Sequence, residues 1–80
     1  MDKKNRIARH YLQEKSPAKV KDLLEMVGLN DDEYSVVWMH DIQRKDILYI
    51  ADTIGLSERR VAELHRRALR KIVDTVEYMR

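Results

Sequence analysis

The sequence predicts an all-α protein, a single small bundle of about five helices. Leu, Ile, Glu, Arg and Lys are abundant, whereas the chain has two glycines, one proline and no phenylalanine, a composition that favours helix. Eighty residues are enough for one domain with one core. The absence of cysteine excludes disulfide bonds and thiolate zinc sites, and it fits a reducing compartment.

The first two helices are predicted from apolar spacing and from a Ser-Pro pair. Apolar side chains recur at helical spacing within residues 2–15, which indicates an amphipathic helix. Ser16 suits an N-cap and Pro17 the first helical position, so a second helix should run to about Val27 and end at Gly28. The side chains expected to face the core are Ile7, Ala8, Tyr11, Leu12, Val20, Leu23, Leu24 and Val27.

A third helix is predicted to begin with an acidic turn. Asn30 or Asp31 can cap it, and acidic side chains in its first turn suit the helix dipole. It should end near Asp41 or Ile42, before the polar connection at residues 43–45. Its apolar residues are too continuous to define one buried face: Tyr34, Val36, Val37, Trp38 and Met39.

A glycine separates the fourth and fifth helices. Asp46 can cap a helix over residues 47–54, and Gly55 supplies the positive-φ conformation that ends it. Ser57 then caps a fifth helix that nothing interrupts before Arg80, a length of about 36 Å. Its apolar continuation should pack on the N-terminal helices, or else on a second copy of the chain: Val73, Val76 and Met79.

Residues 47–72 have the parts of a helix-turn-helix, because two helices are joined by about three residues that include a glycine. Ala51 is small enough for the helices to cross closely, and Gly55 adopts a backbone shape that other residues resist. The apolar wedge that would fix the crossing angle consists of Ile50, Ile54, Val61 and Leu64.

The fifth helix is therefore the candidate recognition helix, whose first turns would enter the major groove of duplex DNA. With its apolar side chains turned inward, four outward side chains are candidates for base contacts: Arg59, Ala62, Glu63 and Arg66. The candidates for phosphate contacts lie on either side of that face, at the start of the fifth helix, or just before the fourth helix. They are Ser57, Arg60, Arg67, Arg70, Lys71, Arg44 and Lys45.

The distribution of charge supports a polyanionic partner. The net charge is +2, but residues 1–28 carry +3, residues 29–56 carry −4 and residues 57–80 carry +3. Two basic ends around an acidic middle suggest an oriented polyanion.

Simpler structural roles compete with DNA contact for several of these side chains. The arginine-rich stretch can be a solvated face with pairs such as Arg59–Glu63 and Glu63–Arg67. Glu63 can accept from a cytosine amino group or act only within the helix. His65 is expected to be packed or hydrogen-bonded rather than to contact a base. The basic residues of the first helix can reach DNA backbone or only increase solubility: Lys3, Lys4, Arg6 and Arg9.

Other classes of function find no support in the sequence. The three histidines are too scattered to suggest a metal site, and no cofactor motif is present. No serine lies in a convincing catalytic set, so an enzyme is not expected. No apolar run has the roughly 18 to 20 residues of a membrane span and the start lacks a signal-peptide core, which predicts a cytoplasmic protein without a membrane partner.

The stretch LNDDEYSVVWMHDIQRKDILYIADTIGLSERRVAELHRRALRKI, residues 29–72, resembles region 4 of bacterial sigma factors, which binds the −35 promoter element. The two align without gaps through the acidic helix start, the Val36–Met39 run, Ile50-Ala51, Ile54-Gly55-Leu56-Ser57, Val61 and Ala68-Leu69-Arg70-Lys71-Ile72. The DNA-binding domain of LuxR-type regulators is a more distant match that needs a one-residue gap. Residues 1–28 and 73–80 would then be N-terminal and C-terminal helical extensions.

The chain departs from this family in three ways. The family has a glycine before the first motif helix, where this chain has Arg44 or Lys45. The family's base-contacting positions hold Glu58, Arg59, Ala62 and Glu63 here, so specificity for the −35 element does not transfer. No room remains for the region that melts promoters, so the resemblance implies a stand-alone regulator of the phage or mobile-element type.

The expected function is sequence-specific binding of double-stranded DNA by a transcriptional regulator. The competing hypothesis is a protein-interaction module that contacts RNA polymerase or another regulator without contacting bases. Trp38 and Met39 in the acidic middle are the discriminating residues, because a partner would need an exposed anchor. Trp38 is expected in the core. A homodimer through the last helix is a further candidate assembly.

Overall fold

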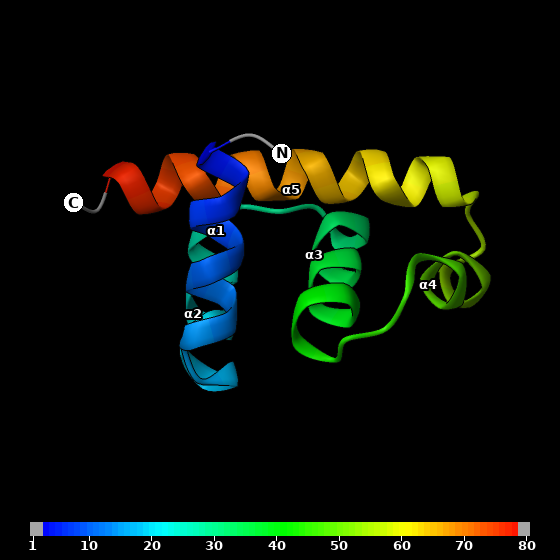
Figure 1. Ribbon diagram of the computed structural model, residues 1–80, viewed down its shortest axis with the longest axis horizontal. Coiled ribbons are helices and arrows are strands. Elements are labelled where there is room, and N and C mark those ends of the chain that lie inside the picture. The colour runs from blue at the N-terminus through cyan, green and yellow to red at the C-terminus, as the bar shows by residue number, and fades with distance from the viewer. Residues whose placement is uncertain (1–2, 79–80) are drawn as a thin grey trace.

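The computed structural model describes residues 3–78 and confirms the all-α fold (Figure 1). The chain forms α1 (Lys3–Glu14), α2 (Pro17–Val27), α3 (Asp31–Val37), the π-helical turn η1 (Trp38–Ile42), α4 (Ile47–Ile54) and α5 (Glu58–Tyr78). No strand occurs within the described range. Helix α5 runs the length of the molecule, with α1 and α2 near its C-terminal end and α4 beyond α3 near its N-terminal end.

Local side-chain and backbone signals set the helix boundaries as predicted. The side chains of Ser16 and Asp46 cap α2 and α4 by accepting the backbone N–H three residues later. Asn30, rather than Asp31, caps α3. Its Oδ1 accepts from the Glu33 N–H at 2.8 Å, and Glu33 Oε1 accepts from the Asn30 N–H at 3.0 Å. Gly55 ends α4 in the left-handed conformation, with φ +73°.

The third helix ends where the sequence predicts, but its last five residues are π-helical and not α-helical. The Gln43 N–H bonds the Trp38 carbonyl at 3.0 Å, and the Lys45 N–H bonds the Met39 carbonyl at 2.9 Å. The same turn carries Asp41, whose carboxylate contacts His65 of α5.

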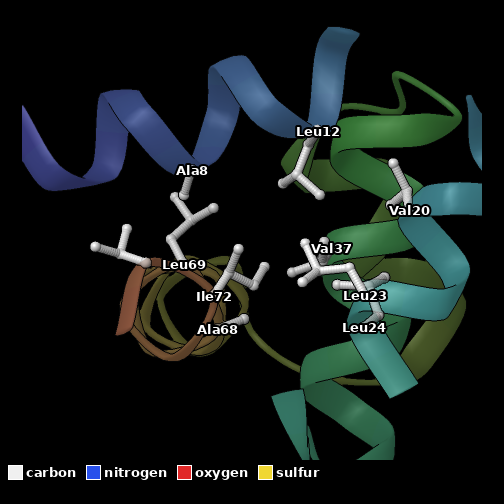
Figure 2. Packing of buried hydrophobic residues seen from close by; sticks show 10 residues of the cluster. Ala8, Leu12, Val20, Leu23, Leu24, Val37, Ala68, Leu69 and Ile72 are labelled. Carbon is white, nitrogen blue, oxygen red and sulfur yellow. The ribbon is translucent and has the colours of Figure 1, made fainter. Parts of the chain in front are cut away.

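The apolar interior consists of two clusters instead of the single core expected. The first cluster joins α1 and α2 to Val37 of α3 and to the C-terminal half of α5 (Figure 2). The second joins α3 and α4 to the N-terminal half of α5 through Val36, Ile50, Ala51, Val61 and Leu64. Adjacent residues Val36 and Val37 thus face different clusters, and α5 connects the two.

The N-terminal helices cover the extended end of α5, as predicted. Ala8 and Leu12 of α1 lie in the first cluster with Leu69 and Ile72. The prediction that Ile7 faces the core is wrong, because Ile7 lies at the edge of the apolar face of α1 and is 39% exposed. Val73 is buried there and Val76 packs against the cluster, so the intramolecular packing is confirmed for both. Met79, predicted to continue this face, lies outside the described residues.

Trp38 and Met39 are half-buried, one against each cluster. The Trp38 ring stacks on Tyr34, with ring centroids 6.2 Å apart and an interplanar angle of 14°. Stacking of this kind contributes about 0.5 to 1.5 kcal/mol of stability beyond the contribution from burying the apolar surface of the rings. Trp38 is therefore mainly a packing residue, with part of its surface left exposed.

Arg44 occupies the turn before α4 in the left-handed conformation, with φ +58°. A residue with a Cβ atom strains there by about 1 to 2 kcal/mol. Arg44 thus holds a backbone conformation that glycine adopts without strain.

We expect Arg44→Gly to raise the free energy of unfolding by about 0.5 to 1 kcal/mol, because relief of strain exceeds the added entropy of the unfolded glycine. Chemical denaturation measures the difference. Lys21→Gly in the exposed middle of α2 is the control and should lower stability by a similar amount. If both substitutions lower stability, the proposal that the Arg44 backbone is strained is wrong.

Candidate nucleic-acid interface

Helices α4 and α5 are joined by a short turn, residues 55–57, that packing and hydrogen bonds hold in place. The N–H groups of Gly55 and Leu56 both bond the Ala51 carbonyl, at 2.9 and 3.1 Å. Ser57 Oγ accepts from the Arg60 N–H at 3.1 Å and so caps α5. The predicted wedge is present: Ile50, Val61 and Leu64 are buried in the second cluster, and Ile54 packs against it.

The four base-contact candidates differ in exposure. Arg59 and Arg66 are exposed on α5, whereas Ala62 and Glu63 are half-buried. Arg59 and Arg66 are seven residues apart, which is two helical turns, so their side chains leave the same face of the helix about 10 Å apart. These two arginines are the long, accessible donors of the candidate set.

Glu63 lies between two arginines on the surface of α5. Its Oε1 is 3.1 Å from Arg60 Nη1 and 3.3 Å from Arg67 Nη2. The pair with Arg67 is the one expected, while the N-terminal partner is Arg60 in place of Arg59, because the i−3 side chain is the better placed. All three side chains are 40% or more exposed, so each pair contributes only a few tenths of a kcal/mol.

Most phosphate candidates are exposed, but their surroundings differ. Ser57, Arg44 and Arg70 are exposed, as are Arg60 and Arg67 of the Glu63 network. The Lys45 ammonium lies 5.0 Å from the centre of the Tyr49 ring, a cation–π contact that directs it toward α4.

Lys71 has a partner within the protein that the sequence did not indicate. Its Nζ donates to Glu33 Oε1 at 2.7 Å, a contact between α5 and the capping box of α3. The Glu33 side chain is 2% exposed and that of Lys71 is 45% exposed. Lys71 therefore compensates a buried carboxylate, which makes it a weaker phosphate candidate than the other basic residues of α5.

The pKa of Glu33 reflects this environment. Burial raises the pKa, but the hydrogen bonds from Lys71 and from the Asn30 N–H, with the charges of Lys71 and Arg67, lower it more. The net result is a pKa below the usual value of 4.5. A carboxylate whose pKa is lowered by folding stabilises the fold above its unfolded pKa, and the stabilisation is lost as the pH falls through the folded pKa.

We predict that Glu33→Gln lowers the free energy of unfolding by about 1 to 3 kcal/mol at neutral pH, because the charge-assisted bond to Lys71 is lost. Denaturation of both proteins between pH 7 and pH 2 measures the effect. The difference should hold down to about pH 5 and then shrink as Glu33 of the wild type becomes protonated. A difference that does not depend on pH would contradict the role of the ion pair.

The expectation that the histidines are scattered is wrong for two of the three. His65 Nε2 and Asp41 Oδ2 are 2.7 Å apart, and the His40 and His65 rings tilt against each other with centroids 4.5 Å apart. His65 is thus hydrogen-bonded, as predicted. His10 remains separate and pairs with Glu14 at 3.1 Å on α1. No local pattern indicates the meeting of η1 and α5 that creates this cluster.

Comparison of the chain with protein-family models, with curated proteins and with solved structures finds no match. Across residues 3–78, no helix combines the length and apolar character that a membrane span requires.

Proposed function

We propose that the protein binds double-stranded DNA with sequence preference, through α5, and regulates transcription. The observation that carries this proposal is the arginine-rich face of α5. Five arginines are exposed along it, while the opposite face is buried in the two clusters. They are Arg59, Arg60, Arg66, Arg67 and Arg70.

The first turns of α5 would lie in the major groove, with α4 behind them as the first helix of a helix-turn-helix. Arg59 and Arg66 then face base edges, where a guanidinium can donate two hydrogen bonds to guanine. Their spacing of about 10 Å corresponds to about three base-pair steps. Two separate positions of a site would therefore be specified by arginine.

Phosphates on either side of the groove would be held by Arg60, Arg67 and Arg70, and by the backbone N–H groups at the start of α5. Ser57 already accepts one of these N–H groups, but its hydroxyl hydrogen can still donate to a phosphate oxygen. Arg44 adds a cation on the turn that precedes α4.

The competing hypothesis of a polymerase-contacting adaptor needs Trp38 as an exposed anchor. Trp38 is half-buried and stacked on Tyr34, and Met39 packs against the second cluster. Neither residue is fully exposed, so the adaptor hypothesis loses part of its support, and DNA binding is the better supported function.

The function is tested by selection from a random duplex library, followed by fluorescence anisotropy of the enriched sequence at several salt concentrations. We expect a defined motif and a logarithmic affinity that falls linearly with the logarithm of salt concentration. Weak binding without enrichment would contradict the proposal and favour the adaptor.

The two kinds of arginine should respond differently to truncation. Arg59→Ala should reduce binding to the selected site by about 1 to 3 kcal/mol and relax preference at one position, because a base contact is lost. Arg67→Ala should weaken all duplexes alike and reduce the salt slope by about 1. Lys19→Ala on α2 is a control for loss of one charge. Equal losses from both arginine variants on every sequence would overturn the assignment.

Glu63 should limit affinity by repelling phosphates and holding Arg60 and Arg67. We predict that Glu63→Gln strengthens binding to every duplex by a factor of about 2 to 5 at low salt, since both exposed ion pairs are released. Glu25→Gln on the exposed face of α2 is the matched control, because it removes one negative charge away from the proposed DNA contacts and no ion pair is observed for Glu25 within residues 3–78. Weaker binding to the selected site alone would instead indicate that Glu63 contacts a base.

A further inference from the structure

His40, Asp41 and His65 form a cluster at the contact between η1 and α5. One ligand-type atom of each residue lies within 4.8 Å of those of the other two. The Asp41 carboxylate is 3% exposed and stands between the imidazoles, with Oδ2 at 2.7 Å from His65 Nε2 and Oδ1 at 3.5 Å from His40 Nδ1. Two imidazole nitrogens and a carboxylate are a common ligand set for zinc-type metals.

The hydrogen bonds of the protein leave this cluster incompletely satisfied. His40 Nδ1 is shielded from solvent and finds no hydrogen-bond partner among the described residues. Its 3.5 Å approach to Asp41 is too poorly aligned to serve as one. A buried polar atom without a partner destabilises a fold, so a bound ligand would account for the position of His40 Nδ1.

The spacing between Asp41 and each histidine is close to the spacing that one ion requires. Tetrahedral zinc with bonds of about 2.1 Å places its ligand atoms about 3.3 Å apart. Asp41 Oδ2 lies 2.7 Å from His65 Nε2 and Asp41 Oδ1 lies 3.5 Å from His40 Nδ1, both within about 0.6 Å of that value. One ligand atom from each of the three residues lies within 4.8 Å of the other two, so the imidazoles would move closer together around an ion. Two of the three residues, His40 and Asp41, also line an open cavity of about 250 Å³.

We propose that His40, Asp41 and His65 bind one divalent transition-metal ion of the zinc type. Three protein ligands leave a fourth position for water. The ion would connect η1 to α5 and fix the angle at which α5 leaves the second cluster. None of the three ligands is a proposed DNA contact, although the phosphate candidates Arg44 and Lys45 lie on the cavity rim, and the test of the site does not require DNA.

The chemistry of the site selects the class of metal. Imidazole nitrogens favour Zn²⁺, Co²⁺ and Ni²⁺, whereas Mg²⁺ and Ca²⁺ prefer oxygen ligands only. The cavity is also lined by three basic side chains and one further acidic one: Arg9, Arg44, Lys45 and Asp46. The excess of positive charge disfavours a cation that is held by electrostatic attraction alone. A transition-metal ion gains additional binding energy from its bonds to the imidazole nitrogens. The basic side chains around the cavity should therefore weaken its binding less than they weaken the binding of Mg²⁺ or Ca²⁺.

The test is calorimetric titration of the full chain with Zn²⁺, with Co²⁺ absorption as a second probe of nitrogen ligation. We expect one ion per chain. At a free Zn²⁺ concentration of about 100 times the Kd, binding increases the ratio of folded to unfolded protein by a factor of about 100. This increase should raise the Tm by about 10 to 20 °C. Mg²⁺ should produce neither effect.

Three glutamine variants decide which histidines hold the ion. His40→Gln and His65→Gln should each weaken Zn²⁺ binding at least about 10-fold. His10→Gln is the matched control and should bind as the wild type does, because His10 lies on α1 paired with Glu14. Circular dichroism checks that each variant is folded. His40→Gln keeps the test decisive if His65→Gln unfolds, because His40 Nδ1 makes no hydrogen bond that the variant would break.

The proposal is overturned if the wild type shows no saturable Zn²⁺ binding below millimolar concentrations. It is also overturned if folded His40→Gln binds as tightly as the wild type, or if His10→Gln loses as much affinity as His40→Gln.

Discussion

The buried face of α5 is the constraint on which the rest of the structure depends. This single helix contributes Val61 and Leu64 to one cluster and Leu69 and Ile72 to the other, and it contacts all the other helices. A domain of 80 residues has little interior, so neither cluster is large enough to be stable alone. Because α5 is continuous, the two clusters support each other and the helix cannot rotate without exposing both.

A fixed buried face also determines what the opposite face can do. Arginines placed at the remaining positions of α5 must point to solvent, and their direction is set by packing rather than by each other. Glu63 moderates this positive surface at one point, between Arg60 and Arg67. Lys71 is the exception, because it turns toward the buried Glu33 and connects α5 to the start of α3. The arginines of α5 therefore form a charged surface, whereas Lys71 stabilises the contact between α5 and α3.

The turn η1 is the part of the fold where local geometry and tertiary packing are most closely linked. The hydrogen bonds that close this turn end on the N–H groups of Gln43 and Lys45. Arg44, between them, has a positive φ that a glycine would adopt without strain. The same turn brings Asp41 against His65. Irregular helical geometry and backbone strain both occur preferentially at functional positions. Their combination with an unsatisfied imidazole nitrogen distinguishes this site from ordinary core packing.

The sequence by itself determined the helices and their boundaries, because caps such as Asn30 and glycines such as Gly55 act within a few residues of the chain. Periodicity likewise identified the inner and outer faces of α5, and with them the candidate arginines. Only the tertiary structure decided which distant side chains meet. Lys71 reaches Glu33 across 38 residues and His65 reaches Asp41 across 24, and no local pattern encodes such separations. These contacts arise because helices docked by their apolar faces bring particular polar positions together, so the two-cluster core, the Glu33 ion pair and the histidine site follow from packing.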